Sequence, residues 1–331
     1  MMRLPKFHYY APRTVAEALT IRSGAGPDAA YVAGGTDLYP NMKRRQQTPK
    51  VVVGLSRVVE LSWIGDRDGR LALGAGLILS TVENDPRVRR DYPGLAHAVS
   101  EISTPPLRNM GTIGGNLLLD TRCNYYDQNF EWRQAIDFCM KTDRKQICWV
   151  APGSPKCLAV QSADTVPVLI AMGARAVLAS PGSEREVAVE DLYRNDGIDY
   201  VTKRPDELLT EVRLPGPRDD AGSAYASLEQ PASGYAIVGV ATVVIRSAAN
   251  APIGASAIAI TGVGPVAYRA SAVEKALTGS DGSAAAIAAA AAHATDGVTV
   301  NSDIHADREY RTEIARVFTV RAIEAALARL G

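Results

Sequence analysis

The chain has 331 residues, with 36 basic and 36 acidic side chains and 47% hydrophobic residues. This composition is typical of a globular protein, and the length allows two or three domains. The balanced charge argues against a nucleic-acid partner. The longest apolar stretch, Ala284 to Ala292, is far shorter than the roughly 20 residues that span a bilayer. The N-terminus lacks the apolar core of a secretory signal, so we expect a cytoplasmic protein without a membrane anchor.

The predicted elements change in character along the chain. Thr14 and Glu17 form a capping-box pattern that predicts a helix start. Expected strands are 31–33, 50–55, 71–75, 176–179, 236–245 and 255–260, and expected helices are 14–19, 38–45, 92–99, 167–172, 271–277, 283–294 and 309–330. Residues 103–116 are rich in Pro, Gly and Asn and are expected to form a loop. The best linker candidate, 215–220, separates an α/β part from a C-terminal part in which strands precede helices, an α+β pattern.

Two glycine pairs stand beside small polar residues. Gly34-Gly35 follows a predicted strand and precedes Thr36 and Asp37, and a second pair lies within 111–116. Loops that approach a phosphate closely need residues without a Cβ atom and backbone N–H groups that point at the anion. Neither segment is a G-x-G-x-x-G or Walker loop, and a single Gly-Gly pair is more often a plain turn. The residues alone therefore leave an anion site and two turns as alternatives.

The four cysteines are unevenly distributed. All of them fall within 35 consecutive positions, with the spacing C-x15-C-x8-C-x8-C: Cys123, Cys139, Cys148 and Cys157. Four thiolates are the ligand set of a 4Fe-4S cluster and of a structural zinc site. Zinc sites usually contain close C-x2-C pairs, which are absent here, and disulfides are unusual in cytoplasm. A cluster is favoured, with zinc, disulfides and unliganded buried cysteines as alternatives.

The same window is rich in aromatic and charged residues. Its aromatics would shield a cluster or only fill the core of the segment: Tyr125, Tyr126, Phe130, Trp132, Phe138 and Trp149. Its charged residues sum to +2: Arg122, Arg133, Lys141, Arg144, Lys145 and Lys156 against Asp127, Glu131, Asp137 and Asp143. They would form either a basic collar that attracts an acidic ferredoxin or a solvated surface. The four histidines, scattered without ligand spacing, are expected to be packing or surface residues: His8, His97, His293 and His305.

Several segments resemble the FAD subunits of molybdenum hydroxylases, the xanthine dehydrogenase family. The two glycine segments are similar to that family's pyrophosphate-binding loops: Val32, Ala33, Gly34, Gly35, Thr36, Asp37 and Leu38, then Gly111, Thr112, Ile113, Gly114, Gly115 and Asn116. Residues 9–14 also match the family's N-terminal pattern. The resemblance further implies that Asp164 and Leu208 contact FAD. Around 228–234 the chain departs from the family, because Glu229, Ser233 and Gly234 replace basic residues.

The resemblance implies a fold and a domain division. The fold class is α+β, with a vanillyl-alcohol-oxidase (PCMH) type FAD-binding domain in two α/β subdomains and a C-terminal α+β domain. The expected bounds are 1–217 for the FAD domain, with subdomains of about 1–57 and 58–217, and 218–331 for the C-terminal domain. The cysteines fall in an expected insertion at about 118–161.

A cluster-bearing insertion in such a subunit resembles the 4-hydroxybenzoyl-CoA reductase branch of the family. That resemblance implies electron transfer from reduced ferredoxin through 4Fe-4S and FAD toward 2Fe-2S and molybdenum, for reductive dehydroxylation of 4-hydroxybenzoyl-CoA. It implies partner subunits that carry molybdopterin and 2Fe-2S clusters, in a dimer of heterotrimers, and no catalytic residue on this chain. The alternative is the FAD subunit of an oxidative molybdenum hydroxylase of aromatic, purine or CO dehydrogenase type, with a zinc-binding or unliganded insertion.

Overall fold

The computed structural model describes residues 3–143, 147–229, 234–248 and 250–330, and the chain divides into two compact units. The first unit comprises 1–79, 105–160 and 175–213, and the second comprises 80–104, 161–174 and 214–331. Each unit is therefore assembled from segments that are distant in sequence.

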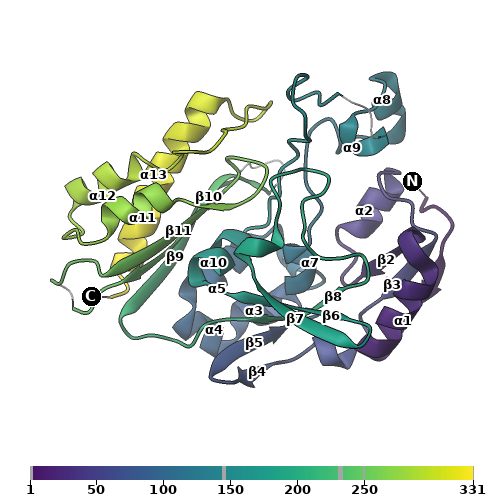
Figure 1. Cartoon of the computed structure of the whole chain (residues 1–331), viewed down its shortest axis with the longest axis horizontal. Coiled ribbons are helices and arrows are strands. Elements are labelled where there is room, and N and C mark those ends of the chain that lie inside the picture. The colour runs from purple at the N-terminus through teal and green to yellow at the C-terminus, as the bar shows by residue number, and fades with distance from the viewer. Residues whose placement is uncertain (1–2, 144–146, 230–233, 249, 331) are drawn as a thin grey trace. The chain divides into compact units, whose positions relative to one another are not determined.

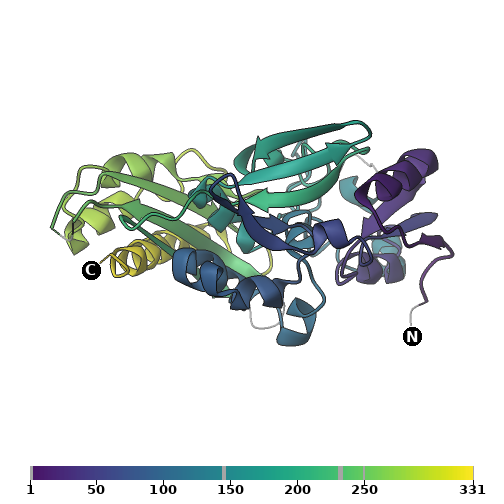
Figure 2. The same cartoon turned by 90° about the horizontal axis from the view of Figure 1, so that it is seen from below.

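The N-terminal part of the first unit is a three-stranded parallel sheet. β1 (His8–Tyr10) and β2 (Ala29–Val32) both pair with β3 (Val51–Gly54), in the order β1-β3-β2. Helix α1 (Val15–Ala25) connects β1 to β2 and lies beside the strands (Figure 2). The second helix of this part, α2 (Leu38–Lys43), follows the first glycine loop and precedes β3 (Figure 1).

The start of α1 confirms half of the predicted capping box. The Thr14 hydroxyl accepts a hydrogen bond from the Glu17 N–H at 3.1 Å, as expected for an N-cap. The Glu17 carboxylate, however, accepts from the N–H of Arg13 at 2.8 Å instead of reaching the N–H of Thr14. Thr14 therefore caps the helix as predicted, but the Glu17 carboxylate bonds one residue earlier in the chain than a capping box requires.

A five-stranded antiparallel sheet forms the rest of the first unit's framework, in the order β4-β5-β8-β6-β7. Its strands are β4 (Ile64–Arg67), β5 (Arg70–Gly74), β6 (Arg175–Ser180), β7 (Ser183–Ala188) and β8 (Leu208–Arg213). The short helices of this unit are α6 (Pro105–Arg108), α7 (Ile113–Leu117), α8 (Phe130–Ala135) and α9 (Met140–Asp143). Helix α7 contacts β5 and β8, so the second glycine loop is mounted on this sheet.

The second unit is an antiparallel sheet with helices against it, in the strand order β12-β11-β10-β9. Its strands are β9 (Ala221–Glu229), β10 (Ala236–Ile245), β11 (Ala255–Thr261) and β12 (Tyr268–Arg269). Its helices are α3 (Leu79–Asn84, which begins at the last residue of the first unit), α4 (Pro86–Asp91), α5 (Pro93–Glu101), α10 (Thr165–Met172), α11 (Ser271–Leu277), α12 (Ala284–Ala291) and α13 (Arg308–Leu327).

Neighbouring residues of β9 show how this sheet is covered. Ala224 belongs to a core cluster with residues of α11, α12 and α13, whereas Tyr225 hydrogen-bonds to Asp164 at the start of α10. Because side chains alternate across a strand, the C-terminal helices and α10 cover opposite faces. Helix α5 also contacts β9.

Most of the predicted elements are confirmed, and one is wrong. The strand 236–245 and the helix 271–277 have the predicted bounds. The predicted loop 103–116 instead contains α6 and begins α7, because prolines are tolerated in the first turn of a helix and Thr112 caps the second one. Strands β4, β7, β8, β9 and β12 were not predicted by the sequence pattern.

Candidate functional site

The two glycine loops lie against each other in the first unit. A Cβ atom on Gly34 would lie 1.8 Å from the carbonyl oxygen of Met110, and one on Gly111 would lie 3.5 Å from Thr36 Oγ1. A side chain at position 34 would push the loops apart, so glycine is required there, whereas the contact at Gly111 is an ordinary van der Waals distance. The structure therefore brings together the two segments that the sequence analysis selected.

The first loop presents unpaired backbone donors. In the described part of the chain, no acceptor binds the N–H groups of residues 34–37. Gly35 has a φ of +73°, in the left-handed region that favours glycine. Successive free N–H groups in such a turn form a concave anion site, which suits the pyrophosphate of a dinucleotide.

The second loop has a different role. The N–H of Ile113 donates to Leu77 O at 2.9 Å, that of Gly114 donates to Ala75 O at 2.9 Å, and that of Gly115 donates to Thr112 Oγ1 at 3.0 Å. Two of these donors therefore hold the loop against the residues that follow β5, and the third bonds within the loop. A Cβ on Gly115 would meet only Thr112 Oγ1 within 4 Å, so this loop offers open backbone surface for a close approach.

Asp37, expected at the cofactor, is engaged by the protein. Its carboxylate forms an ion pair with Arg122 and accepts from the N–H of Asp120 at 3.3 Å. Burial raises the pKa of Asp37, and the Arg122 guanidinium opposes that shift. The neighbouring predicted residues frame the loop, since Val32 ends β2 and Leu38 begins α2. Asp37 thus links the glycine loop to the start of the cysteine segment.

Asp164 is buried at the N-cap of α10 in the second unit. The hydroxyl of Tyr225 donates to its Oδ1 at 2.6 Å. Burial raises the pKa of Asp164 to about 7; the bond from Tyr225 lowers it and the nearby Glu229 raises it. The carboxyl is therefore held close to its titration point at neutral pH.

Two buried polar residues just before Asp164 were missed by the sequence analysis. Both amide atoms of Gln161 and the hydroxyl of Ser162 are buried and have no hydrogen-bond partner among the described residues. Such groups are rare in folded proteins unless a ligand or water satisfies them. Their only sequence signal is adjacency to Asp164, so Gln161 and Ser162 join the candidate cofactor contacts.

Leu208 lies in the hydrophobic core of the first unit. It is 3% exposed and belongs to a cluster with Ala18, Leu19 and Val53. Its described contacts are therefore aliphatic protein groups. Of the three residues that depart from the family around 228–234, only Ser233 lies outside the described residues; Glu229 ends β9, and Gly234 has a φ of +63°.

The cysteine segment is closed at its base by a pair of hydrogen bonds. Arg122 and Val160 exchange N–H···O bonds, each 2.7 Å long. The segment also contacts the residues that follow α2: Gln46 Nε2 donates to Tyr126 O at 2.6 Å, and Arg133 donates to Arg44 O at 2.6 Å. Figure 1 shows α8 and α9 beside α2. The described part of the insertion is thus anchored on the first unit.

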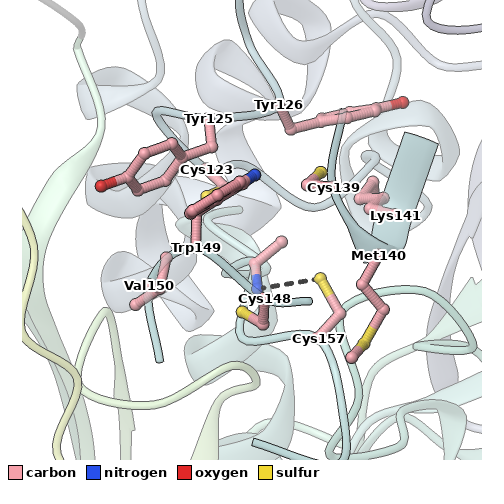
Figure 3. A pocket seen from close by; sticks show the side chains of 11 residues that line it. Cys123, Tyr125, Tyr126, Cys139, Met140, Lys141, Cys148, Trp149, Val150 and Cys157 are labelled. Atoms are coloured by element: carbon pink, nitrogen blue, oxygen red, sulfur yellow. Dashed lines mark hydrogen bonds between the residues drawn. The ribbon is translucent and has the colours of Figure 1, made fainter. Parts of the chain in front are cut away.

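All four cysteines line one pocket within this segment, as Figure 3 shows. The thiols are free, and three of the four residues are buried. Trp149 and Tyr125 lie on one side in this view, and Met140 and Lys141 lie on the other. The complete lining is Cys123, Tyr125, Tyr126, Cys139, Met140, Lys141, Cys148, Trp149, Val150, Cys157 and Ala159. The predicted quartet is therefore brought together by the fold.

The aromatic side chains of the segment divide into two groups. Tyr125 packs on Trp149 with ring centroids 6.5 Å apart, and the Trp149 indole N–H donates to Phe138 O at 2.6 Å. These residues make the wall of the pocket and its support. Phe130 and Trp132 are 40% and 36% exposed, so they do not fill the interior of the segment as expected.

The protonation of the thiols depends on burial. Burial raises the pKa of Cys123 to about 12 and that of Cys157 to about 11, while the Lys141 ammonium opposes the shift at Cys157. Without a ligand, these two thiols are neutral at pH 7. Binding of a metal group would require their deprotonation, which makes such binding stronger as pH rises.

Among the described residues, no group of three or more His, Cys, Asp or Glu side chains is arranged to hold one metal ion. Four cysteines around a multi-iron cluster are spaced more widely than around one zinc ion, because several metal and sulfide atoms separate them. Four cysteine thiols are the donor set of a 4Fe-4S cluster and also of a structural zinc site.

Three of the six cations expected in a basic collar or on a solvated surface lie inside the protein. The side chains of Arg122 and Lys141 are 14% and 7% exposed and are ion-paired, and Arg133 is buried. Arg144 and Lys145 lie outside the described residues. Both alternatives put these three cations at the surface, because sequence cannot show that they bind internal carboxylates and carbonyls. Separately, no helix in the described ranges is long and apolar enough to cross a bilayer.

Comparison with known proteins covers both halves of the chain. A family model described as "FAD binding domain in molybdopterin dehydrogenase" matches residues 5–217, and one described as "CO dehydrogenase flavoprotein C-terminal domain" matches residues 223–326. The carbon monoxide dehydrogenase medium chain of Hydrogenophaga pseudoflava is 30% identical over 330 residues, 98% of each chain. The nicotine 6-hydroxylase medium subunit of Paenarthrobacter nicotinovorans is 26% identical, over 99% of this chain and 100% of that one.

The solved structures agree with these matches. A carbon monoxide dehydrogenase structure from Hydrogenophaga pseudoflava superposes with a TM-score of 0.82 at 28% identity and covers 100% of both chains. The fold is therefore a FAD-binding domain of the vanillyl-alcohol-oxidase (PCMH) type with a C-terminal α+β domain, as predicted. The free N–H groups of the first glycine loop and the close packing of the second agree with these matches. The chain belongs to the molybdenum hydroxylase family, as its FAD-binding medium subunit.

Proposed function

We propose that this FAD-binding subunit also holds a 4Fe-4S cluster on Cys123, Cys139, Cys148 and Cys157, and that it transfers electrons within a heteromeric molybdenum enzyme. The observation that carries the proposal is the lining of a single pocket by all four cysteines of the chain. FAD exchanges one or two electrons and a cluster exchanges one, so a subunit with both connects one-electron carriers to a two-electron reaction.

The chain's own residues would hold these groups in separate places. The free N–H groups of residues 34–37 would bind the FAD pyrophosphate, and the open backbone at Gly115 would let it approach. Asp164, Gln161 and Ser162 are the further candidate contacts, since their buried polar groups suit a polar ligand. Leu208 and the remaining residues of 111–116 would support the loops. No general acid or base is assigned to this chain.

The partners would be a molybdopterin-binding large subunit and a 2Fe-2S small subunit, in a cytoplasmic dimer of heterotrimers. Two enzyme classes are candidates. The oxidative class, which hydroxylates or dehydrogenates a small substrate, is supported by the relatives: one acts as a carbon monoxide dehydrogenase and another as a nicotine 6-hydroxylase. Both alignments cover nearly the full length of this chain and of the relative, which further supports the oxidative class.

The second candidate is reductive dehydroxylation of 4-hydroxybenzoyl-CoA, with reduced ferredoxin as the electron donor. The cysteine pocket is the observation that favours it, because an additional one-electron centre on a closed insertion gives a separate entry point for electrons of low potential. In the oxidative class the same centre would serve as an exit.

Iron and labile sulfide analysis of the anaerobically purified chain tests the cluster. We expect about four iron and four sulfide per FAD. Cys139→Ser should lose the iron and keep the FAD, because Cys139 lines the pocket and the free N–H groups of residues 34–37 belong to another segment. Met140→Leu, a volume-conserving change in the same lining, is the matched control and should keep both. A wild-type chain with FAD and no iron would refute the cluster.

Assays of the purified complex separate the two enzyme classes. With dithionite-reduced ferredoxin and 4-hydroxybenzoyl-CoA, loss of the phenolic hydroxyl would support the reductive class. With an oxidised dye and carbon monoxide or an N-heteroaromatic substrate, dye reduction would support the oxidative class. Turnover in only one direction rejects the other candidate.

A further inference from the structure

We propose that Lys141, restrained by Asp120, is the buried cation that sets the reduction potential of the cysteine site. The inference rests on the proposed function, since it requires a redox group on the four cysteines. Lys141 lines the same pocket as these cysteines, and its side chain is only 7% exposed. It lies two residues after Cys139, at the start of α9.

The ammonium group of Lys141 is held in place by three acceptors. Its Nζ lies 2.7 Å from Asp120 Oδ1 and 2.9 Å from Gly197 O, and it also donates to Thr121 Oγ1. It further lies 4.6 Å from the ring centroid of Tyr126. A lysine ammonium has three protons to donate, so all of them are used and the group cannot turn toward solvent without breaking these bonds.

The acceptors themselves are fixed to the cysteines. Gly197 donates its N–H to Cys157 O at 2.9 Å, so the carbonyl that binds Lys141 belongs to a residue that also holds a cysteine. Asp120 accepts in addition from Tyr126 Oη at 2.9 Å and from Gln47 at 3.0 Å. The position of the positive charge relative to the pocket is therefore determined by a network and not by one contact.

A fixed charge at this place acts on electron transfer. Reduction brings one electron from a low-potential one-electron donor into the site, and the site becomes more negative by one charge without any bond to the chain being broken. In a buried environment of low dielectric constant a nearby ammonium stabilises that added charge more than water-exposed groups do. Lys141 therefore raises the potential, and the carboxylate of Asp120 behind it moderates the effect.

The other charges near the pocket are placed differently from Lys141. Arg133 is a second buried cation, but it does not line the pocket, and its guanidinium donates to the carbonyls of Arg44 and Asn129. Asp127 accepts from the N–H of Cys123 at 3.2 Å and is paired with Arg122 at 3.3 Å. Lys141 is the cation among these that lines the pocket itself.

Redox titration of three variants, monitored by the EPR signal of the reduced cluster, tests the inference. Lys141→Met should lower the ratio of reduced to oxidised cluster at least tenfold at a fixed solution potential, which is a shift of about −59 mV for one electron. Asp120→Asn should shift the potential in the opposite direction, because it removes the opposing carboxylate. Lys141→Arg keeps the charge and should change the ratio by less than threefold.

Lys203 offers a matched control in the same unit. Its ammonium donates to the carbonyls of Arg204 and Glu207 at 3.0 and 2.9 Å, and it does not line the cysteine pocket. Lys203→Met should therefore leave the potential unchanged. Opposite shifts of the Lys141 and Asp120 variants would support the inference, because general loosening of the site would move both in one direction.

The possible failures are distinguishable. Wild-type protein without iron overturns the cluster, and this inference with it. Iron in the wild type, with potentials that are unchanged or shifted in the same direction in the Lys141→Met and Asp120→Asn variants, overturns the inference alone. If Lys141→Met loses its iron, Asp120→Asn decides: a raised potential supports the role of the charge, and an unchanged or lowered one refutes it.

Discussion

At the scale of single residues, Asp164 makes the stability of the second unit depend on pH. Its pKa in the folded chain is about 7, above its ordinary value of 3.8, mainly because of burial. The folded state therefore binds the proton more tightly than the unfolded state. This contribution to stability is complete below about pH 4 and is lost as the pH rises through 7.

Asp164→Asn should remove this dependence. Between pH 5 and pH 8, the free energy of unfolding of the variant should rise relative to that of the wild type by about 2–3 kcal/mol, because only the wild type has a carboxyl that is protonated in the folded state and ionised in the unfolded state in this range. Urea unfolding of the full chain at both pH values measures the difference. Tyr225→Phe, which keeps the carboxyl, is the control and should retain the pH dependence. An unchanged gap at the two pH values would contradict the assignment.

Gly34 illustrates a residue whose lack of a side chain is structural. In Gly34→Ala the new Cβ would lie 1.8 Å from Met110 O, so the loops must separate. We expect a loss of about 1–3 kcal/mol of stability and weaker retention of FAD. Gly24→Ala is the matched control: it meets nothing within 4 Å and lies inside α1, so it should add about 0.5–1 kcal/mol. Urea unfolding and the flavin absorbance after desalting measure both effects.

At the scale of elements, the cysteine insertion is tied to the glycine loop by the ion pair of Asp37 and Arg122. Their side chains are 24% and 14% exposed, so the pair is shielded from solvent. A double-mutant cycle with Asp37→Asn, Arg122→Met and the double variant should give a coupling free energy of about 1–3 kcal/mol. Additive changes in urea unfolding would show instead that the insertion and the loop are independent.

The elements that the sequence did not predict share a physical character. Strand β7 is polar and half-exposed, and β9 contains small residues such as Gly222, Ser223 and Ala224, so neither has an apolar alternation. They are strands because neighbours supply their hydrogen bonds: β6 pairs with β7, and β10 pairs with β9. By contrast, 236–245 is apolar and β-branched, and its own composition predicts a strand.

At the scale of the whole molecule, the sequence allowed the type of site to be predicted but not its internal division of roles. The glycine pairs and the cysteine spacing indicated an anion site and a joint cysteine site. Which glycine loop has free N–H groups depends on the carbonyls of Ala75 and Leu77, which occupy the second loop. The partner of Asp37 is 85 positions away, and no local pattern encodes such a separation.

Gly197 has a consequence for protein engineering. A Cβ atom at this position would lie 2.7 Å from Cys157 Sγ, so only glycine lets this distant loop close over the cysteine segment. The same residue accepts from Lys141 and Thr121. Residues 118–161 are therefore not a transferable module. A graft of this segment into another flavin subunit would also need Gly197 and the carboxylate of Asp37. Without them, we expect the two ends of the segment to pair but the pocket not to form.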